Sequence, residues 1–270
     1  MVLGLDFPYC HPVSLYEYLI GIISFNGEGI ILDFFPGSAT TFHATQILNK
    51  SNNGRRRCIL IEQGEYVYSI IIPRIKKIAY SFDWKEGKPE NQNGLGIFFK
   101  YQRLEQYEDA LENIVFDKEV DTAQAQLQFA DYIPKYMLKF ETKGSNTFLN
   151  TDEMQNPFAY QLKVLDNYQY IPTQIDLLET FNYLIGLHIH KHITAEHQKR
   201  QYVFITGNNR YGKGIAIVWR NTKSLDLHKD KNFITKQLDG IKYSILYVNG
   251  DCMIANYSPI EPVFKNKMLL

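Results

Sequence analysis

The sequence has no excess of charge of either sign, because 29 basic and 29 acidic residues leave a formal net charge of zero. A polyanion such as DNA would therefore meet no overall positive field, and any DNA contact must come from a local patch or from another chain. Cysteine is equally scarce, and Cys10, Cys58 and Cys252 lie far apart, with the spacing of neither a metal site nor a disulfide framework. This usage predicts a protein of the reducing cytoplasm.

Long apolar runs are also missing. No segment reaches the roughly 20 apolar residues of a membrane span, and the first residues lack the basic region and apolar core of an export signal. We therefore expect a soluble chain with no membrane partner. With 270 residues, of which 45% are hydrophobic, the chain can bury a large core in one large domain or two modest ones.

The most informative segment is the run Asp-Phe-Phe-Pro-Gly-Ser-Ala-Thr-Thr at residues 33–41. It follows the apolar residues 29–32 and precedes a helical stretch over 42–49, which is the order of a strand, a small-residue turn and a helix start. Such a turn lets a ligand approach the backbone, and the helix N-terminus offers free N–H groups to a carboxylate or a phosphate. The next apolar strand, residues 57–61, ends in Glu62 at about the 20-residue distance expected for a neighbouring strand. An acidic side chain there can hold both ribose hydroxyls of an adenosine.

Helical and strand patterns alternate through the first part of the chain, which predicts a parallel α/β sheet. Leu15, Tyr18, Leu19 and Ile22 fall on one face of an expected helix at residues 14–23. The further elements expected in this part are a helix over 69–80, a polar loop over 82–96, a short strand over 97–101 and a helix over 104–114.

The pattern changes beyond residue 115, and we place a domain boundary between residues 120 and 121. The expected domains are thus residues 1–120 and 121–270. In the second we expect helices over 132–141 and 176–187, a hairpin of strands 201–206 and 214–220, and a strand over 241–248.

Two groups of side chains have both a functional and a structural explanation. His188, His190 and His192 alternate, so a strand would bring them to one face, but without nearby cysteines or paired acids a polar strand edge or a helix end is favoured over a metal site. The basic residues Arg55, Arg56, Arg57, Arg74, Lys76 and Lys77 could face phosphate, although solvated surface is the more common role of such residues.

The amino-acid sequence of residues 33–44 resembles motif I of the DNA adenine-N6 methyltransferases. The pattern of that motif is Asp-x-Phe-x-Gly-Ser-Gly-Thr-Thr, and its loop binds S-adenosylmethionine. Residues 7–15, Phe-Pro-Tyr-Cys-His-Pro-Val-Ser-Leu, resemble motif X of that family. Motif X upstream of motif I marks the β-type permuted order. The similarity continues through residues 61–66, 73–77, 99–109, 156–160 and 179–184. Together these segments resemble the C-terminal half of a modification (Mod) subunit of type III restriction–modification systems.

The resemblance implies an α/β fold: part of a Rossmann-like, S-adenosylmethionine-dependent methyltransferase sheet, followed by a smaller α+β C-terminal domain suited to dimer or partner contacts. The usual sheet has seven strands, of which residues 29–101 would supply three. The implied cofactor-binding residues are His11 and Pro12 of motif X, Glu62 on the ribose, and the motif I residues Asp33, Phe35, Gly37, Ser38, Thr40 and Thr41. The alternatives are that the threonines only cap a helix, that Glu62 is a carboxylate at the next helix entry, and that His11 is exposed without a role.

The chain departs from the family pattern at three places. Ala39 replaces the second glycine of motif I, and a positive φ there would cost on the order of 1 kcal/mol. Pro36 replaces a small residue, and His11 stands where motif X has lysine, which would make the cofactor grip weaker because histidine is only partly charged at neutral pH.

The catalytic sequence Asp-Pro-Pro-Tyr of this family does not occur. Asp6-Phe7-Pro8-Tyr9 and Asn156-Pro157-Phe158 are near misses, and we assign neither a catalytic residue nor a metal ligand. In the β-type order, catalysis and target recognition precede motif X, so we expect an upstream chain to supply both, with DNA contacted through the complex and a homodimer or a restriction subunit as further partners. The alternative is an inactive assembly module derived from such a subunit, which leaves enzyme activity open.

Overall fold

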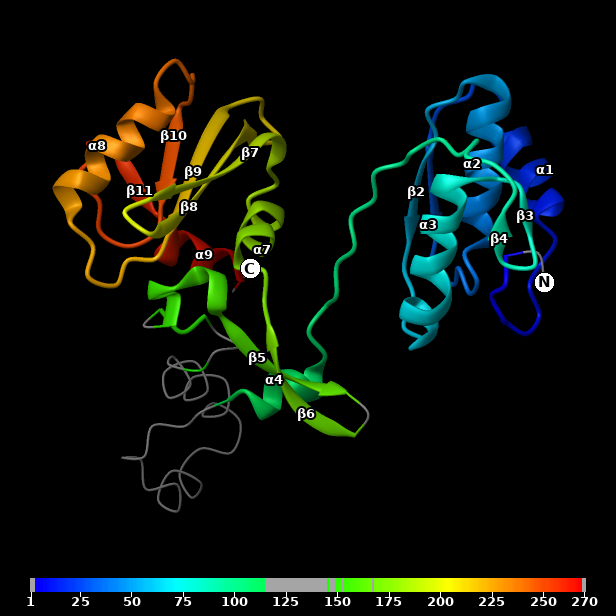
Figure 1. Cartoon of the computed structure of the whole chain (residues 1–270), viewed down its shortest axis with the longest axis horizontal. Helices are drawn as coiled ribbons and strands as arrows, with labels where there is room; N and C mark the ends of the chain where they lie inside the picture. The colour runs from blue at the N-terminus through cyan, green and yellow to red at the C-terminus, as the bar shows by residue number, and fades with distance from the viewer. Residues whose placement is uncertain (1–2, 115–144, 146–148, 152, 167, 269–270) are drawn as a thin grey trace, which may run out of the picture. The chain divides into compact units, whose positions relative to one another are not determined.

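The computed structural model describes residues 3–114, 145, 149–151, 153–166 and 168–268. It divides the chain into two compact units, Met1–Gln102 and Arg103–Leu270 (Figure 1). The expected boundary between residues 120 and 121 lies outside the described residues, and so does the helix expected over 132–141. None of the helices in the described part is long and apolar enough to cross a membrane.

The N-terminal unit is a two-stranded parallel sheet with helices packed on it. Strands β1 and β2 pair in parallel, with Leu32 opposite Ile59 in the register. The elements in order are α1 (Val13–Ile23), β1 (Ile30–Asp33), α2 (Thr40–Asn52), β2 (Arg57–Leu60), the π-helix η1 (Val67–Ile71), α3 (Ile72–Tyr80), β3 (Trp84–Lys85) and β4 (Lys88–Pro89). The predicted strand, turn and helix at residues 29–49, and the strand that leads to Glu62, are all present.

The core of this unit lies between the sheet and the helices α2 and α3. Its buried residues are Ala39, Phe42, Ile71, Ile75 and Ile78, with Cys58 and Leu60 of β2 packed against them. Burial of these apolar side chains holds the start of α2 against the end of β1, because each large one, such as Phe42 or Ile75, contributes roughly 1.5–3 kcal/mol on leaving water. The bend between β1 and α2 is therefore built directly on the core.

The strand expected over residues 97–101 is not formed. The prediction that this unit supplies three strands to one parallel sheet was therefore wrong, because that sheet consists of β1 and β2 in the described part of the chain. The amides of Gly94 and Gly96 donate to the carbonyls of Tyr80 and Ala79, which ties this segment to the end of α3 rather than to the sheet. Phe98 is fully exposed. An apolar run forms a strand only where it can pair with the edge of a neighbouring strand. Here the preceding loop holds the segment at the end of α3, away from such an edge.

Two apolar surfaces of the N-terminal unit are uncovered. On the sheet, Ile30 and Leu32 of β1 lie on the same face as Ile59 and Ile61, and all four are about half exposed. A parallel sheet is normally covered on both faces. On α1, the apolar stripe predicted from helical spacing is present but faces solvent, and its members are Leu15, Tyr18, Leu19 and Ile22. The inner side of α1, including Ile20, packs on α2.

Two of the basic residues interpreted as solvated surface are buried. Arg56 is 4% exposed, and its guanidinium donates to the carbonyl of Ser24 at 2.6 Å and to the side-chain oxygen of Asn52 at 3.1 Å. It thereby joins the end of α1 to the end of α2. Arg74 is 7% exposed and binds the bend between β1 and α2.

The C-terminal unit is centred on a five-stranded mixed sheet of order β11-β10-β9-β8-β7. Its elements in order are α4 (Tyr107–Glu112), the 3-10 helices η3 (Glu153–Gln155) and η4 (Pro157–Ala159), β5 (Gln161–Asp166), β6 (Gln169–Gln174), α7 (Leu177–Leu184), β7 (His188–His197), β8 (Arg200–Asn208), β9 (Gly214–Arg220), α8 (Leu227–Leu238), β10 (Ile245–Val248), β11 (Tyr257–Pro259) and α9 (Ile260–Met268). The predicted hairpin is confirmed as β8 and β9, and the strand predicted over 241–248 begins later, at Ile245.

Both faces of this sheet are covered. One face packs a cluster with Phe181 of α7 and Phe264 of α9, and the other packs Phe204 and Val218 against Ile234 of α8. Figure 1 shows α8 on one side of the sheet and α7 with α9 on the other. This unit is thus a complete three-layer structure, in contrast to the open sheet of the first.

The alternating histidines lie on β7, at the edge of the sheet, as favoured from the sequence. His188, His190 and His192 are exposed, and a register shift between Ile189 and Lys191 interrupts the alternation. Within the described residues no group of three or more His, Cys, Asp or Glu side chains is gathered as metal ligands.

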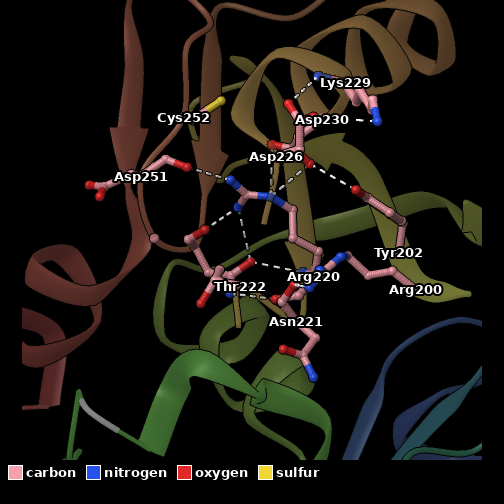
Figure 2. A network of polar contacts seen from close by, with 12 residues as sticks. Arg200, Tyr202, Arg220, Asn221, Thr222, Asp226, Lys229, Asp230, Asp251 and Cys252 are labelled. Atoms are coloured by element: carbon pink, nitrogen blue, oxygen red, sulfur yellow. Dashed lines mark hydrogen bonds and ion pairs between the residues drawn. The ribbon is translucent and has the colours of Figure 1, made fainter. Parts of the chain in front are cut away.

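A buried polar network joins β9, α8 and the loop after β10 (Figure 2). The Arg220 guanidinium and the Asp230 carboxylate are both fully buried and 3.1 Å apart. The Tyr202 hydroxyl donates to the same carboxylate at 2.9 Å, and Arg220 also donates to the carbonyls of Asn249 and Asp251. Burial and the neighbouring Asp230 charge raise the pKa of Tyr202. The two buried charges, Arg220 and Asp230, neutralise each other, which marks the network as a structural element.

We predict that Asp230→Ala strongly destabilises the C-terminal unit. Removal of the carboxylate leaves the guanidinium of Arg220 buried without a counter-charge, which typically costs about 3–5 kcal/mol. Lys229→Ala is the control, because the Lys229–Asp226 pair is exposed and should contribute less than about 1 kcal/mol. Urea unfolding of the full chain measures both changes, and equal effects of the two variants would contradict the structural role of the network.

Candidate functional site

The bend between β1 and α2 is fixed at its start by Asp33, the last residue of β1. One oxygen of the Asp33 carboxylate accepts from the Phe35 amide at 3.0 Å, and the other accepts from the hydroxyl of Thr41. The side chain therefore joins the two ends of the bend. The bend itself turns through two left-handed residues, Gly37 at φ 52° and Ala39 at φ 64°.

Glu62, which follows the end of β2, faces this bend. Its Oε2 atom accepts from the Gly37 amide at 3.2 Å, and its Oε1 atom accepts from the amides of Gln63 and Gly64 at 2.8 and 2.9 Å. Thus Oε1 takes the role of a carboxylate at the following turn, which was the alternative interpretation, while Oε2 lies at the bend. Desolvation alone would raise the pKa of Glu62, but hydrogen bonds from Gly64, Tyr66, Gln63 and Gly37 outweigh it and leave that pKa lowered.

The hydroxyls of the bend are turned inward. Arg74 of α3 donates through one guanidinium nitrogen to the Ser38 carbonyl at 3.1 Å, to the Ser38 hydroxyl at 2.8 Å and to the Thr40 hydroxyl at 3.3 Å. Its other terminal nitrogen lies 3.2 Å from Nδ1 of His43. No side chain caps α2, whose N-cap residue is Ala39, so the interpretation that the threonines only cap the helix was wrong.

Because the hydroxyls are occupied, the groups left at the bend are backbone amides. The amides of Thr40, Thr41 and Phe42 form the first turn of α2 and have no hydrogen-bond acceptor in the part of the chain that the structure describes. α2 is 13 residues long. The N-terminus of such a helix favours a carboxylate or a phosphate, since its free N–H groups and the helix dipole both attract negative charge.

The segment before α1 reaches the bend through Phe7 rather than through His11. The Phe7 ring packs edge-on against Tyr66 with centroids 5.1 Å apart, and a Cβ on Gly37 would lie 3.6 Å from the same ring. His11 is exposed, with its ring 6.0 Å from that of Tyr16, and Pro12 is the exposed N-cap residue of α1. The structure thus brings Asp33, Gly37, Ser38, Thr40, Thr41 and Glu62 together, while Phe35 is 90% exposed and His11 and Pro12 lie in the exposed segment before α1.

Ala39 has the left-handed backbone that glycine adopts without strain. The resulting penalty is about 1–2 kcal/mol. Its methyl group is fully buried in the core cluster with Phe42 and Ile75. It therefore contributes packing on the core side.

Three residues of this site were missed from the sequence. Arg74 was grouped with surface basic residues, and Tyr66 and His43 were not singled out. Burial and the neighbouring Arg74 lower the pKa of His43 to about 4, so the ring is neutral and accepts from the guanidinium. The available signal was the apolar spacing of α3 around Arg74, which places that side chain on the buried face together with Ile75 and Ile78.

Residues 4–73 match a family model described as DNA methylase. The matched range contains both strands of the parallel pair, the bend and Glu62, and it ends one residue before Arg74. It supports a DNA methyltransferase relationship for the N-terminal unit, in a family that generally uses S-adenosylmethionine. Comparisons with curated proteins and with solved structures gave no match.

We predict that Glu62 makes the stability of the N-terminal unit depend on acid pH. Because folding lowers the pKa of this carboxyl, its contribution is present above the unfolded pKa of about 4.5 and is lost as the pH falls through the lower folded value. The free energy of unfolding, measured in urea from pH 7 to pH 3, should therefore decline more steeply for the natural chain than for Glu62→Gln. The exposed neighbour Glu65 supplies the control, and Glu65→Gln should follow the natural chain. Parallel curves for the natural chain and Glu62→Gln would contradict this assignment.

Proposed function

We propose that the N-terminal unit is the S-adenosylmethionine-binding part of a DNA adenine-N6 methyltransferase of the type III Mod kind. The catalytic Asp-Pro-Pro-Tyr motif and the target-recognition domain would be supplied by a second chain. The observation that carries the proposal is the 3.2 Å contact between the Gly37 amide and the Glu62 carboxylate, at the ends of the neighbouring parallel strands β1 and β2. Ligands of α/β sheets bind outside the carboxyl ends of the strands.

The groups at the bend fit the two ends of this cofactor. The free amides at the start of α2 suit its carboxylate, because a helix N-terminus attracts an anion. The Oε2 atom of Glu62 accepts a hydrogen bond from the Gly37 amide, and a carboxylate oxygen has further acceptor capacity for ribose hydroxyls. When bound, the cofactor would supply the methyl group, and the residues of this chain would hold and orient it.

The open sheet supports a partner chain. Within the described residues β1 pairs with β2 alone, so its other edge has no neighbouring strand. The exposed face with Ile30, Leu32, Ile59 and Ile61 is apolar, and parallel sheets are stable when both faces are covered. A chain that adds strands beside β1 and helices over this face would complete the sheet. DNA would be bound by the assembled complex, since this chain carries no net positive charge.

The second candidate is a non-catalytic assembly module. The exposed apolar stripe on α1 favours it, because Leu15, Tyr18, Leu19 and Ile22 form a surface suited to a partner rather than to solvent. The strained Ala39 also favours it. The two candidates share a partner surface and differ in whether the bend binds the cofactor.

Cofactor binding by the full chain is the direct test. Isothermal titration with S-adenosylmethionine, with and without the product of the adjacent upstream reading frame, should detect one site per chain. Glu62→Ala should weaken binding at least tenfold, which corresponds to about 1.4 kcal/mol, because the ribose loses its acceptor.

The control is Glu65→Ala, which removes an exposed carboxylate from the same loop and should bind like the natural chain. Thermal unfolding of each variant shows that the unit is folded. No heat of binding in either the absence or the presence of the upstream product would reject the cofactor-binding function and leave the assembly module.

A further inference from the structure

Within the described residues, Arg74 is a buried cation without a carboxylate partner. It is 7% exposed, and its acceptors are the Ser38 carbonyl, the hydroxyls of Ser38 and Thr40, the neutral ring of His43 and the side chain of Cys10. In the described part of the chain it forms no salt bridge, and its Nε atom is buried without a hydrogen-bond partner. Buried charges in proteins are normally paired.

Arg74 contacts the bend at the start of α2. Its guanidinium bonds Ser38, which precedes the helix, and Thr40, which begins it, and the helix dipole is positive at this end. Two of the side chains that it contacts, Ser38 and Thr40, are each only 4% exposed. The arginine therefore acts on the bend from its core side.

The bend also requires a restraint. Ala39 stands between Ser38 and Thr40 in a left-handed conformation that alanine adopts reluctantly. Arg74 binds the residues on both sides of it, so the guanidinium fixes this conformation and with it the direction of the amides of Thr40, Thr41 and Phe42. Arginine suits this task because its planar fork presents several donors in a fixed geometry.

We propose that Arg74 is the positioning residue of the cofactor site: it holds the bend at Ala39 in its binding conformation and supplies the positive charge toward which the cofactor's carboxylate is oriented. This role rests on the proposed function. It assigns to Arg74 the cationic role that the sequence resemblance gave to His11, whose side chain is exposed near Tyr16.

The test compares two ligands that differ in the amino-acid part. S-adenosylhomocysteine carries the carboxylate, and 5′-methylthioadenosine has the same nucleoside without it. Arg74→Met should weaken binding of S-adenosylhomocysteine at least tenfold and change binding of 5′-methylthioadenosine less than threefold. Lys76→Met, an exposed position of the same helix, should change neither. Equal losses for both ligands, or no loss for either, would overturn the proposal.

A second variant separates positioning from charge. Arg74→Lys keeps the charge but loses the planar fork of donors, so it should weaken S-adenosylhomocysteine binding. Adding Ala39→Gly should restore the affinity to within about threefold of the natural chain, because glycine adopts the left-handed conformation freely. Additive effects of the two changes would refute the positioning role. Should the Arg74 variants fail to fold in thermal unfolding, His43→Leu removes one acceptor of the guanidinium, and the same cycle with Ala39→Gly should show the same rescue.

Failure of the proposed function has a different signature. If the natural chain binds neither ligand, with or without the upstream product, that function is rejected, and native-state hydrogen exchange then tests the positioning role. The amides of Ala39 and His43, which donate to the carbonyls of Pro36 and Ala39, should exchange at least tenfold faster in Arg74→Lys and slow again in the double variant with Ala39→Gly. Unchanged exchange in Arg74→Lys would overturn the positioning role by itself.

Discussion

The site depends on the closeness of two parallel strand ends. β1 and β2 pair in register, so the chain that leaves β1 at Asp33 and the chain that leaves β2 toward Glu62 emerge side by side. The Gly37 amide can reach the Glu62 carboxylate only because of this pairing. A carboxylate held by several backbone amides remains ionised, and an ionised carboxylate beside a helix N-terminus gives the bend both an acceptor and a set of donors. The chemistry proposed for the bend follows from this juxtaposition.

The sheet that supplies these strand ends is incomplete in the described part of the chain, because one of its faces is not covered. Two parallel strands cannot bury both of their faces with α2 and α3 on one side alone, which leaves Ile30, Leu32, Ile59 and Ile61 exposed. The C-terminal unit shows the contrast, since its five-stranded sheet has apolar clusters on both faces and a fully paired Arg220–Asp230 network. Within the described residues, both faces of the five-stranded sheet of the second unit are covered, whereas the first unit presents apolar surfaces that another chain can cover.

Local patterns predicted most of the elements around the bend. The apolar run, the small-residue turn and Glu62 lie where the sequence placed them because strand, turn and helix signals act over short distances. The strand expected over 97–101 failed, since strand formation also needs a free edge within reach, and Gly94 and Gly96 are bonded to the end of α3. The burial of Arg74 was missed for a related reason. Periodicity shows which residues share a face, as Leu15 and Tyr18 do, but it does not show whether that face meets the core, solvent or another chain.

The two buried arginines differ in how their charge is balanced. Arg220 has a buried carboxylate, Asp230, and its charge is neutralised within the fold. Arg74 has no carboxylate partner among the described residues, and desolvation lowers its pKa. A protein that buries a guanidinium among carbonyl, hydroxyl and imidazole groups retains a positive potential at that point, since such acceptors satisfy hydrogen bonds without cancelling the charge. At the start of α2 this potential adds to the helix dipole, so an anionic group that arrives at the bend is stabilised by both. Replacement of the motif I glycine by Ala39 is tolerable under this arrangement, because the same guanidinium that attracts the anion also bonds the residues on either side of the strained position.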